Sequence, residues 1–214
     1  VVVLCYRAVR VKERKIWMKN KIGKALIGIG VFLILAAFIL VLYNFYREYN
    51  AKKKVEKYLP KLEKIIKDHS GGNNNADNEK SSKTMNIDGM NFLGILSVPS
   101  KNLELPILAD YSYELLDTAP CRYSGSYDSD DLVIGGHNYR SHFSKLKSIK
   151  NGEEIFFTSF DGTVYKYSVL RVEILEPTQI EDLINKQNTD DWDLTLFTCT
   201  SSGAARCVIR CKSE

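Results

Sequence analysis

The sequence predicts a mainly β domain, either a sandwich or a barrel, that follows one N-terminal membrane-spanning helix. Short runs of β-branched and aromatic residues, separated by Gly, Asn, Asp and Ser, recur through the second half of the chain. An uncharged apolar segment of helical length lies near the N-terminus. With 214 residues, of which 44% are hydrophobic, the chain can form one domain with its own core.

The predicted strands share a short length and turn residues at both ends. They cover residues 92–98, 103–107, 132–136, 154–158, 163–174, 194–199 and 206–212. Asp161-Gly162, between two of these runs, is typical of a hairpin turn. Several short strands with few helices favour a closed or doubly layered β architecture.

The apolar segment at residues 25–43 contains no charged side chain. At about 1.5 Å per residue, a helix of this length crosses a hydrocarbon layer of about 30 Å. Tyr43, Phe45 and Tyr46 would form an aromatic belt at the membrane surface. A cleaved signal peptide is the alternative, but bulky aromatic residues follow the segment in place of a small-residue cleavage site. We therefore expect a single-pass anchor in the cell membrane.

Basic residues outnumber acidic ones more strongly before the apolar segment than after it. The positive-inside rule then favours a cytoplasmic N-terminus at residues 1–24 and an extracellular domain. Met18-Lys19-Asn20-Lys21, shortly before the apolar segment, is typical of a bacterial start. Residues 1–17 are therefore candidates for sequence translated upstream of the natural start.

Two segments of different character join the span to the domain. Residues 44–69 place apolar side chains at helical spacing among lysines and glutamates, which predicts an amphipathic stalk interrupted or restarted at Pro60. This stalk either binds anionic lipid or rests its apolar stripe on the domain, and we favour the second interpretation. Residues 70–86 are rich in Gly, Asn, Ser, Asp and Lys, which predicts a flexible linker that lets a domain at residues 87–214 move over the membrane.

Three candidate catalytic residues stand at the ends of predicted strands. Cys199 ends one strand and Arg206 begins the next, while His137 follows the apolar run at residues 132–136. The thiolate is the reactive form of cysteine, and a thiol of pKa about 8.5 needs a nearby cation or base to react well at neutral pH. The chain offers both.

This pattern resembles the sortases, the membrane-anchored cysteine transpeptidases of Gram-positive bacteria. Their T-L-x-T-C signature stands at residues 195–199, their strand-end G-H at Gly136-His137, and their arginine at Arg206. The resemblance covers about residues 92–212 and implies an eight-stranded β-barrel with short helices. The sequence shows neither an Asp-Pro-aromatic lid motif nor a second span. Within the family it is therefore class D-like or class B-like, with class D favoured.

The resemblance also implies a reaction. Cys199 would cleave an LPxTG-like sorting signal near the C-terminus of a secreted protein and form a thioester with it. An amine of a peptidoglycan precursor or of a pilin would then resolve the thioester. His137 would exchange protons with the two amines, Arg206 would hold the substrate and stabilise the oxyanion, and Thr198 is a further candidate for substrate binding. No cofactor and no metal is expected.

Other residues of the same types have simpler interpretations. His142 lies in a segment that anchors apolar residues, so we interpret it as structural or peripheral, and His69 falls near the linker and is expected in solvent. Cys207 and Cys211, about 13 Å apart along one strand, are too far apart for a disulfide and are expected in the core. A zinc site is disfavoured because no C-x-x-C spacing occurs.

Two other functions remain open at this stage. A membrane-anchored cysteine protease would use the same residues and transfer the acyl group to water. A surface binding module without catalytic activity would bury an unreactive Cys199. Nucleic acid is not an expected partner, because the formal net charge of +4 comes from the residues that flank the span and from the stalk.

Overall fold

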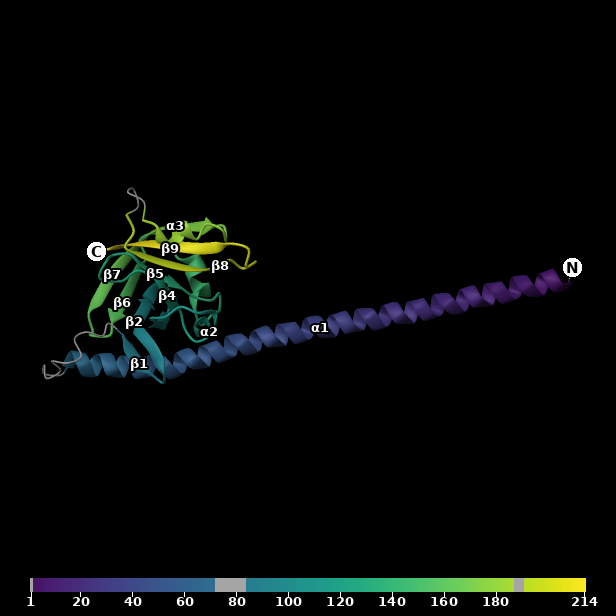
Figure 1. Cartoon of the computed structure of the whole chain (residues 1–214), viewed down its shortest axis with the longest axis horizontal. Helices are drawn as coiled ribbons and strands as arrows, with labels where there is room; N and C mark the ends of the chain where they lie inside the picture. The colour runs from purple at the N-terminus through teal and green to yellow at the C-terminus, as the bar shows by residue number, and fades with distance from the viewer. Residues whose placement is uncertain (1, 72–83, 187–190) are drawn as a thin grey trace. The chain divides into compact units, whose positions relative to one another are not determined.

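The computed structural model describes residues 2–71, 84–186 and 191–214, and of residues 2–22 and 70–71 only the backbone. The chain divides into two compact units, Val1–Tyr46 and Arg47–Glu214. Helix α1 (Val2–Gly71) contributes to both units (Figure 1).

The first unit is the N-terminal part of α1. From Gly23 onward this helix is long and apolar enough to cross a membrane. Its large apolar side chains are exposed, among them Phe32, Ile34 and Phe38. This part of the helix contains the span expected at residues 25–43, and its exposed apolar surface suits a lipid environment.

The second unit is a β-barrel. Its strands are β1 (Met85–Ile87), β2 (Met90–Val98), β3 (Leu103–Leu108), β4 (Cys121–Ser124), β5 (Leu132–Gly135), β6 (Glu154–Ser159), β7 (Val164–Leu175), β8 (Leu194–Cys199) and β9 (Arg206–Ser213). In the described residues they follow the order β1-β2-β3-β4-β5-β8-β9-β7-β6, and β2 also pairs with β6. That last pairing closes β2 to β9 into an eight-stranded barrel, and β1 extends β2 as a hairpin. The mainly β prediction and the eight-stranded barrel implied by the resemblance are confirmed.

Short helical segments connect the strands. They are the 3-10 helices η1 (Pro99–Lys101) and η2 (Phe143–Ser148) and the α-helices α2 (Tyr113–Leu116) and α3 (Glu181–Ile184). α2 precedes β4, η2 follows β5, and α3 precedes β8. η2 and α3 therefore border β5 and β8, the strands at whose C-terminal ends His137 and Cys199 lie.

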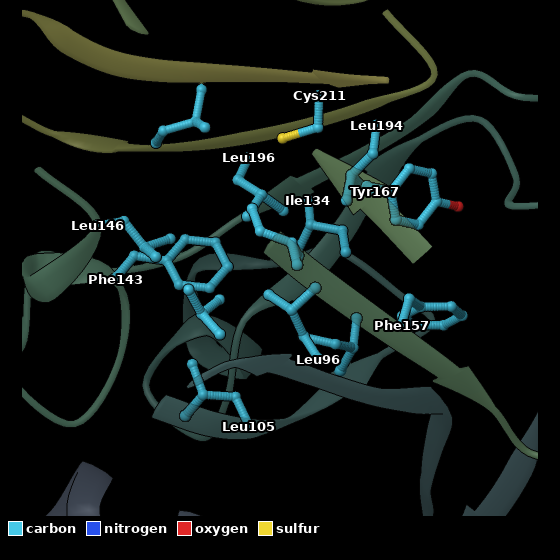
Figure 2. Close-up of a cluster of buried hydrophobic side chains, with 14 of the residues drawn as sticks. Leu96, Leu105, Ile134, Phe143, Leu146, Phe157, Tyr167, Leu194, Leu196 and Cys211 are labelled. Carbon is cyan, nitrogen blue, oxygen red and sulfur yellow. The ribbon is translucent and has the colours of Figure 1, made fainter. Parts of the chain in front are cut away.

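The period of two along each strand separates an inner from an outer face. Leu194 and Leu196 of β8 point into the barrel, while Phe197 packs outside with Trp192 and Val208. Figure 2 shows part of the inner core, to which several strands and η2 contribute: Leu96, Leu105, Ile134, Phe143, Leu146, Phe157, Tyr167, Leu194, Leu196 and Cys211. The interior is filled by side chains, so ligands have access only from outside.

The C-terminal half of α1 packs on the barrel. Ala51, Val55, Tyr58, Leu62 and Ile66 are buried at helical spacing, against an apolar surface that includes Phe92, Leu108 and Leu116. The stalk thus rests its apolar stripe on the domain, the interpretation favoured from the sequence. The helix is also continuous through Pro60, so the expected interruption there was wrong. A proline inside a helix costs about 3 kcal/mol, which the buried stripe on both sides offsets.

The described structure also changes the expected role of the linker at residues 70–86. Residues 72–83 lie outside the described residues, but Met85 and Asn86 belong to β1. The segment therefore connects a helix and a strand of the same folded unit. Since this unit begins at Arg47, the linker does not tether a separate domain starting at residue 87.

Replacing Leu62 tests whether the helix is part of the fold. Its side chain is 0% exposed, so Leu62→Ala should lower the free energy of unfolding by about 2–5 kcal/mol through lost burial and a cavity. Lys64→Ala, an exposed position on the same helix, is the matched control and should change little. Urea unfolding of the full chain in detergent micelles measures both. If both variants lower the free energy of unfolding by an equally small amount, the helix is not packed on the barrel.

Candidate active site

Cys199 and Arg206 face each other at the ends of two paired strands. Cys199 ends β8, Arg206 begins β9, and the two are the last pair of the antiparallel ladder. A guanidinium N–H of Arg206 (Nη1) donates to Sγ of Cys199 at 3.5 Å. Both side chains are half-buried. The strand register therefore places a permanent cation against the thiol, as the spacing of the two residues in the sequence suggested.

His137 follows the end of the neighbouring strand and is level with Cys199. β5 runs parallel to β8, and Gly135 is the partner of Phe197. His137 and Cys199 thus stand two residues beyond the same pair, on adjacent strands. A hydrogen bond extends this alignment past the strand end, because Gly136 N donates to Phe197 O at 3.0 Å. Phe143 N of η2 donates to His137 O at 3.1 Å and ties the next residue to the following turn. The three residues identified from the sequence come together at one end of β5, β8 and β9.

The two glycines before His137 make room for aromatic rings. A Cβ on Gly135 would lie 2.6 Å from the Phe197 ring, and one on Gly136 would lie 2.7 Å from the Phe143 ring. Neither contact is possible without moving a ring. The Gly-Gly-His sequence thus lets two rings pack against the backbone that carries the imidazole.

The cysteines differ in exposure. Within the described residues the free cysteines are Cys121, Cys199, Cys207 and Cys211, and of these Cys199 alone is not fully buried. Burial raises the pKa of Cys121 to about 12 and raises the pKa values of Cys207 and Cys211 as well. These three thiols stay protonated and inert at neutral pH. A binding module with a buried Cys199, one of the alternatives above, does not fit this arrangement.

The Thr198 side chain is buried. It is 1% exposed on the inner face of the barrel, and its hydroxyl has no hydrogen-bond partner among the described residues. The alternation along β8 explains this placement, because the neighbours of an outward Cys199 must point inward. The expectation that Thr198 binds substrate through its side chain is therefore not supported by the geometry.

The remaining histidines and the second arginine take structural positions. His142 is fully buried, and burial lowers its pKa to about 3, so its ring is neutral at ordinary pH. His69 is exposed at the end of α1, where it contacts the Ile65 carbonyl. Arg210 lies on the same outer face as Arg206 but is buried. Its guanidinium pairs with Glu173 and donates to Thr195 Oγ1.

Arg210 also fixes the segment before β8. It donates to the carbonyl oxygens of Asp182 and Leu183 in α3, and its guanidinium stacks 4.8 Å from the Trp192 ring centroid. Breaking a buried, hydrogen-bonded charge is costly, so α3 is held firmly against β9.

A cavity of about 140 Å³ opens beside Arg206. Tyr111 and Tyr123 line one part of it and Ile180, Leu183 and Phe197 another. Its wall thus includes Leu183 of α3 and residues of the connection at 176–180 that precedes it. Sequence reasoning missed the two tyrosines, which lie in or before β4, a strand that was not predicted.

One acidic residue near His137 was also missed. Asp117, directly after α2, places Oδ1 3.2 Å from Nε2 of His137. Burial lowers the pKa of His137, and the Asp117 carboxylate acts in the opposite direction. No sequence motif marks Asp117, since only the fold brings it to the imidazole. Among the described residues no three His, Cys, Asp or Glu side chains form a group that could hold a metal ion.

Comparisons with known proteins give a consistent result. A family model described as Sortase domain matches residues 96–214. The chain is 24% identical over 177 residues to Sortase D of Bacillus subtilis (strain 168), covering 80% of this chain and 87% of the relative. It is 25% identical over 184 residues to Sortase A of Bacillus anthracis, covering 81% and 86%.

Solved structures show the same fold. Sortase C1 from Streptococcus agalactiae superposes with a TM-score of 0.54 and 22% identity, covering 76% of this chain and 98% of that one. Sortase C of Streptococcus pneumoniae superposes with a TM-score of 0.51 and 23% identity, covering 57% and 66%. At this identity the superpositions establish the shared barrel.

The packing around Gly136 predicts that substitutions of Gly136 and Phe143 have coupled effects on stability and activity. Gly136→Ala should displace the Phe143 ring and the backbone of His137, lower the free energy of unfolding by about 1–3 kcal/mol, and reduce activity. Phe143→Leu alone should also destabilise, but in the double variant the smaller side chain should recover part of the Gly136→Ala loss. Unfolding midpoints and activity of the four chains measure the coupling. If the effects of the two substitutions are strictly additive, the Phe143 ring does not confine the backbone at Gly136.

Proposed function

This chain belongs to the sortase family, and we propose that Cys199, His137 and Arg206 carry out its reaction. Sortases are cysteine transpeptidases that attach proteins to the cell wall or to a pilin, which gives the reaction class of the chain. The observation that carries the residue assignment is the contact of Arg206 with Sγ of the partly exposed Cys199, beside the strand end that bears His137. The further steps follow from the chemistry of these groups.

In the first half-reaction the Cys199 thiolate attacks the carbonyl carbon of the scissile peptide bond. A carbon–sulfur bond forms, the carbon–nitrogen bond breaks, and the His137 imidazolium gives its proton to the leaving amine. Arg206, already beside the sulfur, donates to the oxyanion that develops on the carbonyl oxygen. A planar, permanently charged guanidinium suits this task better than an ammonium group.

In the second half-reaction an amine attacks the thioester. Neutral His137 accepts a proton from the amine, a new amide bond forms, and the sulfur leaves as thiolate. Cys199 is then again a thiolate and His137 is again protonated, so the enzyme has returned to its initial state. Hydrolysis by water would follow the same path, so the acceptor amine distinguishes a transpeptidase from a protease.

The cavity beside Arg206 is the proposed site for an apolar side chain of the sorting signal. Tyrosine rings, Ile180, Leu183 and Phe197 offer an apolar wall next to the reacting groups. This apolar wall suits an aliphatic side chain such as the leucine of an LPxTG-like sequence. Arg210, by holding α3, keeps this wall in place.

We further propose that the catalytic unit lies outside the cell. The apolar part of α1 and the family indicate a membrane-anchored protein. The excess of basic residues before the span favours a cytoplasmic N-terminus. The partners are then secreted proteins with a C-terminal sorting signal and an amine of a peptidoglycan precursor or a pilin.

Mass spectrometry of the full chain in detergent micelles tests the assignment. With a library of Leu-Pro-x-Thr-Gly peptides and triglycine, the wild type should give an amine-joined product, and Cys199→Ala should give none. Arg206→Lys should lower kcat by about 100-fold, the scale of a lost oxyanion donor. A product of hydrolysis alone would favour the protease. Full activity of Cys199→Ala would overturn the assignment.

A further inference from the structure

Asp117 lies where the juxtamembrane helix meets the candidate base. It directly follows α2, outside the barrel strands, and its Oδ1 contacts three partners. Nη2 of Arg47, on α1, donates to it at 2.6 Å, and the hydroxyl of Tyr139 donates to it at 3.3 Å. Its distance to Nε2 of His137 is 3.2 Å. One carboxylate therefore joins α1, the α2–β4 connection and the loop after β5.

The contact with His137 is close, and it involves a nitrogen that water does not reach. Nε2 of His137 is buried, and its contact with Oδ1 of Asp117 is an ion pair when the ring is protonated. The His137 ring also lies beside an aromatic ring, because its centroid is 4.8 Å from the centroid of the Tyr139 ring. A carboxylate at this place can hold the ring and favour its protonated form.

We propose that Asp117 is a positioning residue for His137 and that Arg47 makes the juxtamembrane helix part of the active site. This inference rests on the proposed function, in which His137 transfers protons to and from the reacting amines. Asp117 acts through His137 and needs no contact with substrate. Arg47 holds the carboxylate in place and moderates its charge.

Packing explains why Arg47 lies at this point. It precedes Ala51 and Val55 by one and two helical turns, so it continues the stripe that α1 buries on the barrel. Two neighbouring contacts tie the same helix to the same loops. Glu48 accepts a hydrogen bond from the Arg140 backbone at 3.1 Å, and Lys54 donates to Thr118 Oγ1 at 3.2 Å. The buried stripe thus fixes the register of these polar contacts.

The charges around the imidazole act in opposite directions. Burial lowers the pKa of His137, the Asp117 carboxylate raises it, and the Arg47 guanidinium lowers it. Arg47 in turn holds the pKa of Asp117 below its usual value although burial opposes this. Other titratable or charged groups near this loop include the Tyr139 phenol, neutral His142, Arg140 of the loop itself, Glu48 and Lys54 on α1, and Cys199 and Arg206 at the ends of β8 and β9.

Asp117 and Arg47 act in opposite directions on the pKa of His137, and this gives a test. A merely structural role of Asp117 would not produce pKa shifts of opposite sign in variants of the two residues. In the full chain in detergent micelles, labelled with 13C-histidine, the pKa of His137 can be followed by NMR, with His137→Ala and His69→Gln for assignment. Asp117→Asn should lower this pKa and Arg47→Gln should raise it. Lys52→Gln makes the same charge change as Arg47→Gln at an exposed position of the same helix and should leave the pKa unchanged.

Activity provides the second measurement. Asp117→Asn should lower kcat of transpeptidation about 10-fold with a smaller change in KM, a part of the about 10²- to 10⁴-fold that a general acid–base contributes. Asp117→Glu, which keeps the charge, should recover part of this loss. An unchanged kcat in Asp117→Asn, or pKa shifts of equal sign in Asp117→Asn and Arg47→Gln, would overturn the inference.

The same series separates this inference from the proposed function. If His137→Ala retains transpeptidation, the role proposed for His137 is wrong and the inference about Asp117 falls with it. If His137→Ala is inactive while Asp117→Asn matches the wild type in both kcat and the pKa of His137, only the positioning role is overturned.

Discussion

The register of three adjacent strands is the constraint on which the site depends. Parallel pairing of β5 with β8 aligns Gly135 with Phe197, and antiparallel pairing of β8 with β9 aligns Cys199 with Arg206. A shift by one residue in either ladder would turn Cys199 or Arg206 to the opposite face. Because the inner faces of these strands are filled by apolar side chains, such a shift would also expose the core.

The surroundings of the site support this register from both sides. Inside, Phe143 packs against Gly136. Outside, Phe197 packs against Gly135, and buried Arg210 fixes α3 beside the cavity that opens next to Arg206. α1 adds a third support, since its buried stripe brings Arg47 to Asp117 and Asp117 to the imidazole. This part of α1 therefore belongs to the same compact unit as the strand ends.

Much of the fold could be predicted from the sequence, and so could the position of Cys199, His137 and Arg206 at the ends of strands. Strong β patterns and turn residues located β2, β3 and β5 to β9 to within a few residues, but β1 and β4 were missed because each has only three or four residues and lacks a clear apolar pattern. The break expected at Pro60 was wrong because tertiary packing overrides local preference. Asp117 and Arg47 could not be found, since 70 residues separate them and only packing of α1 on the barrel joins them.

The most direct test of a nucleophile activated at the strand ends is its chemical reactivity. The rate of alkylation by iodoacetamide at each cysteine of the native full chain can be resolved by peptide mass spectrometry at pH 7. The account predicts that Cys199 reacts well before Cys121, Cys207 and Cys211, and that Arg206→Gln slows Cys199 alone. If Cys199 reacts as slowly as the three buried thiols and is indifferent to Arg206→Gln, the strand ends do not form an active site.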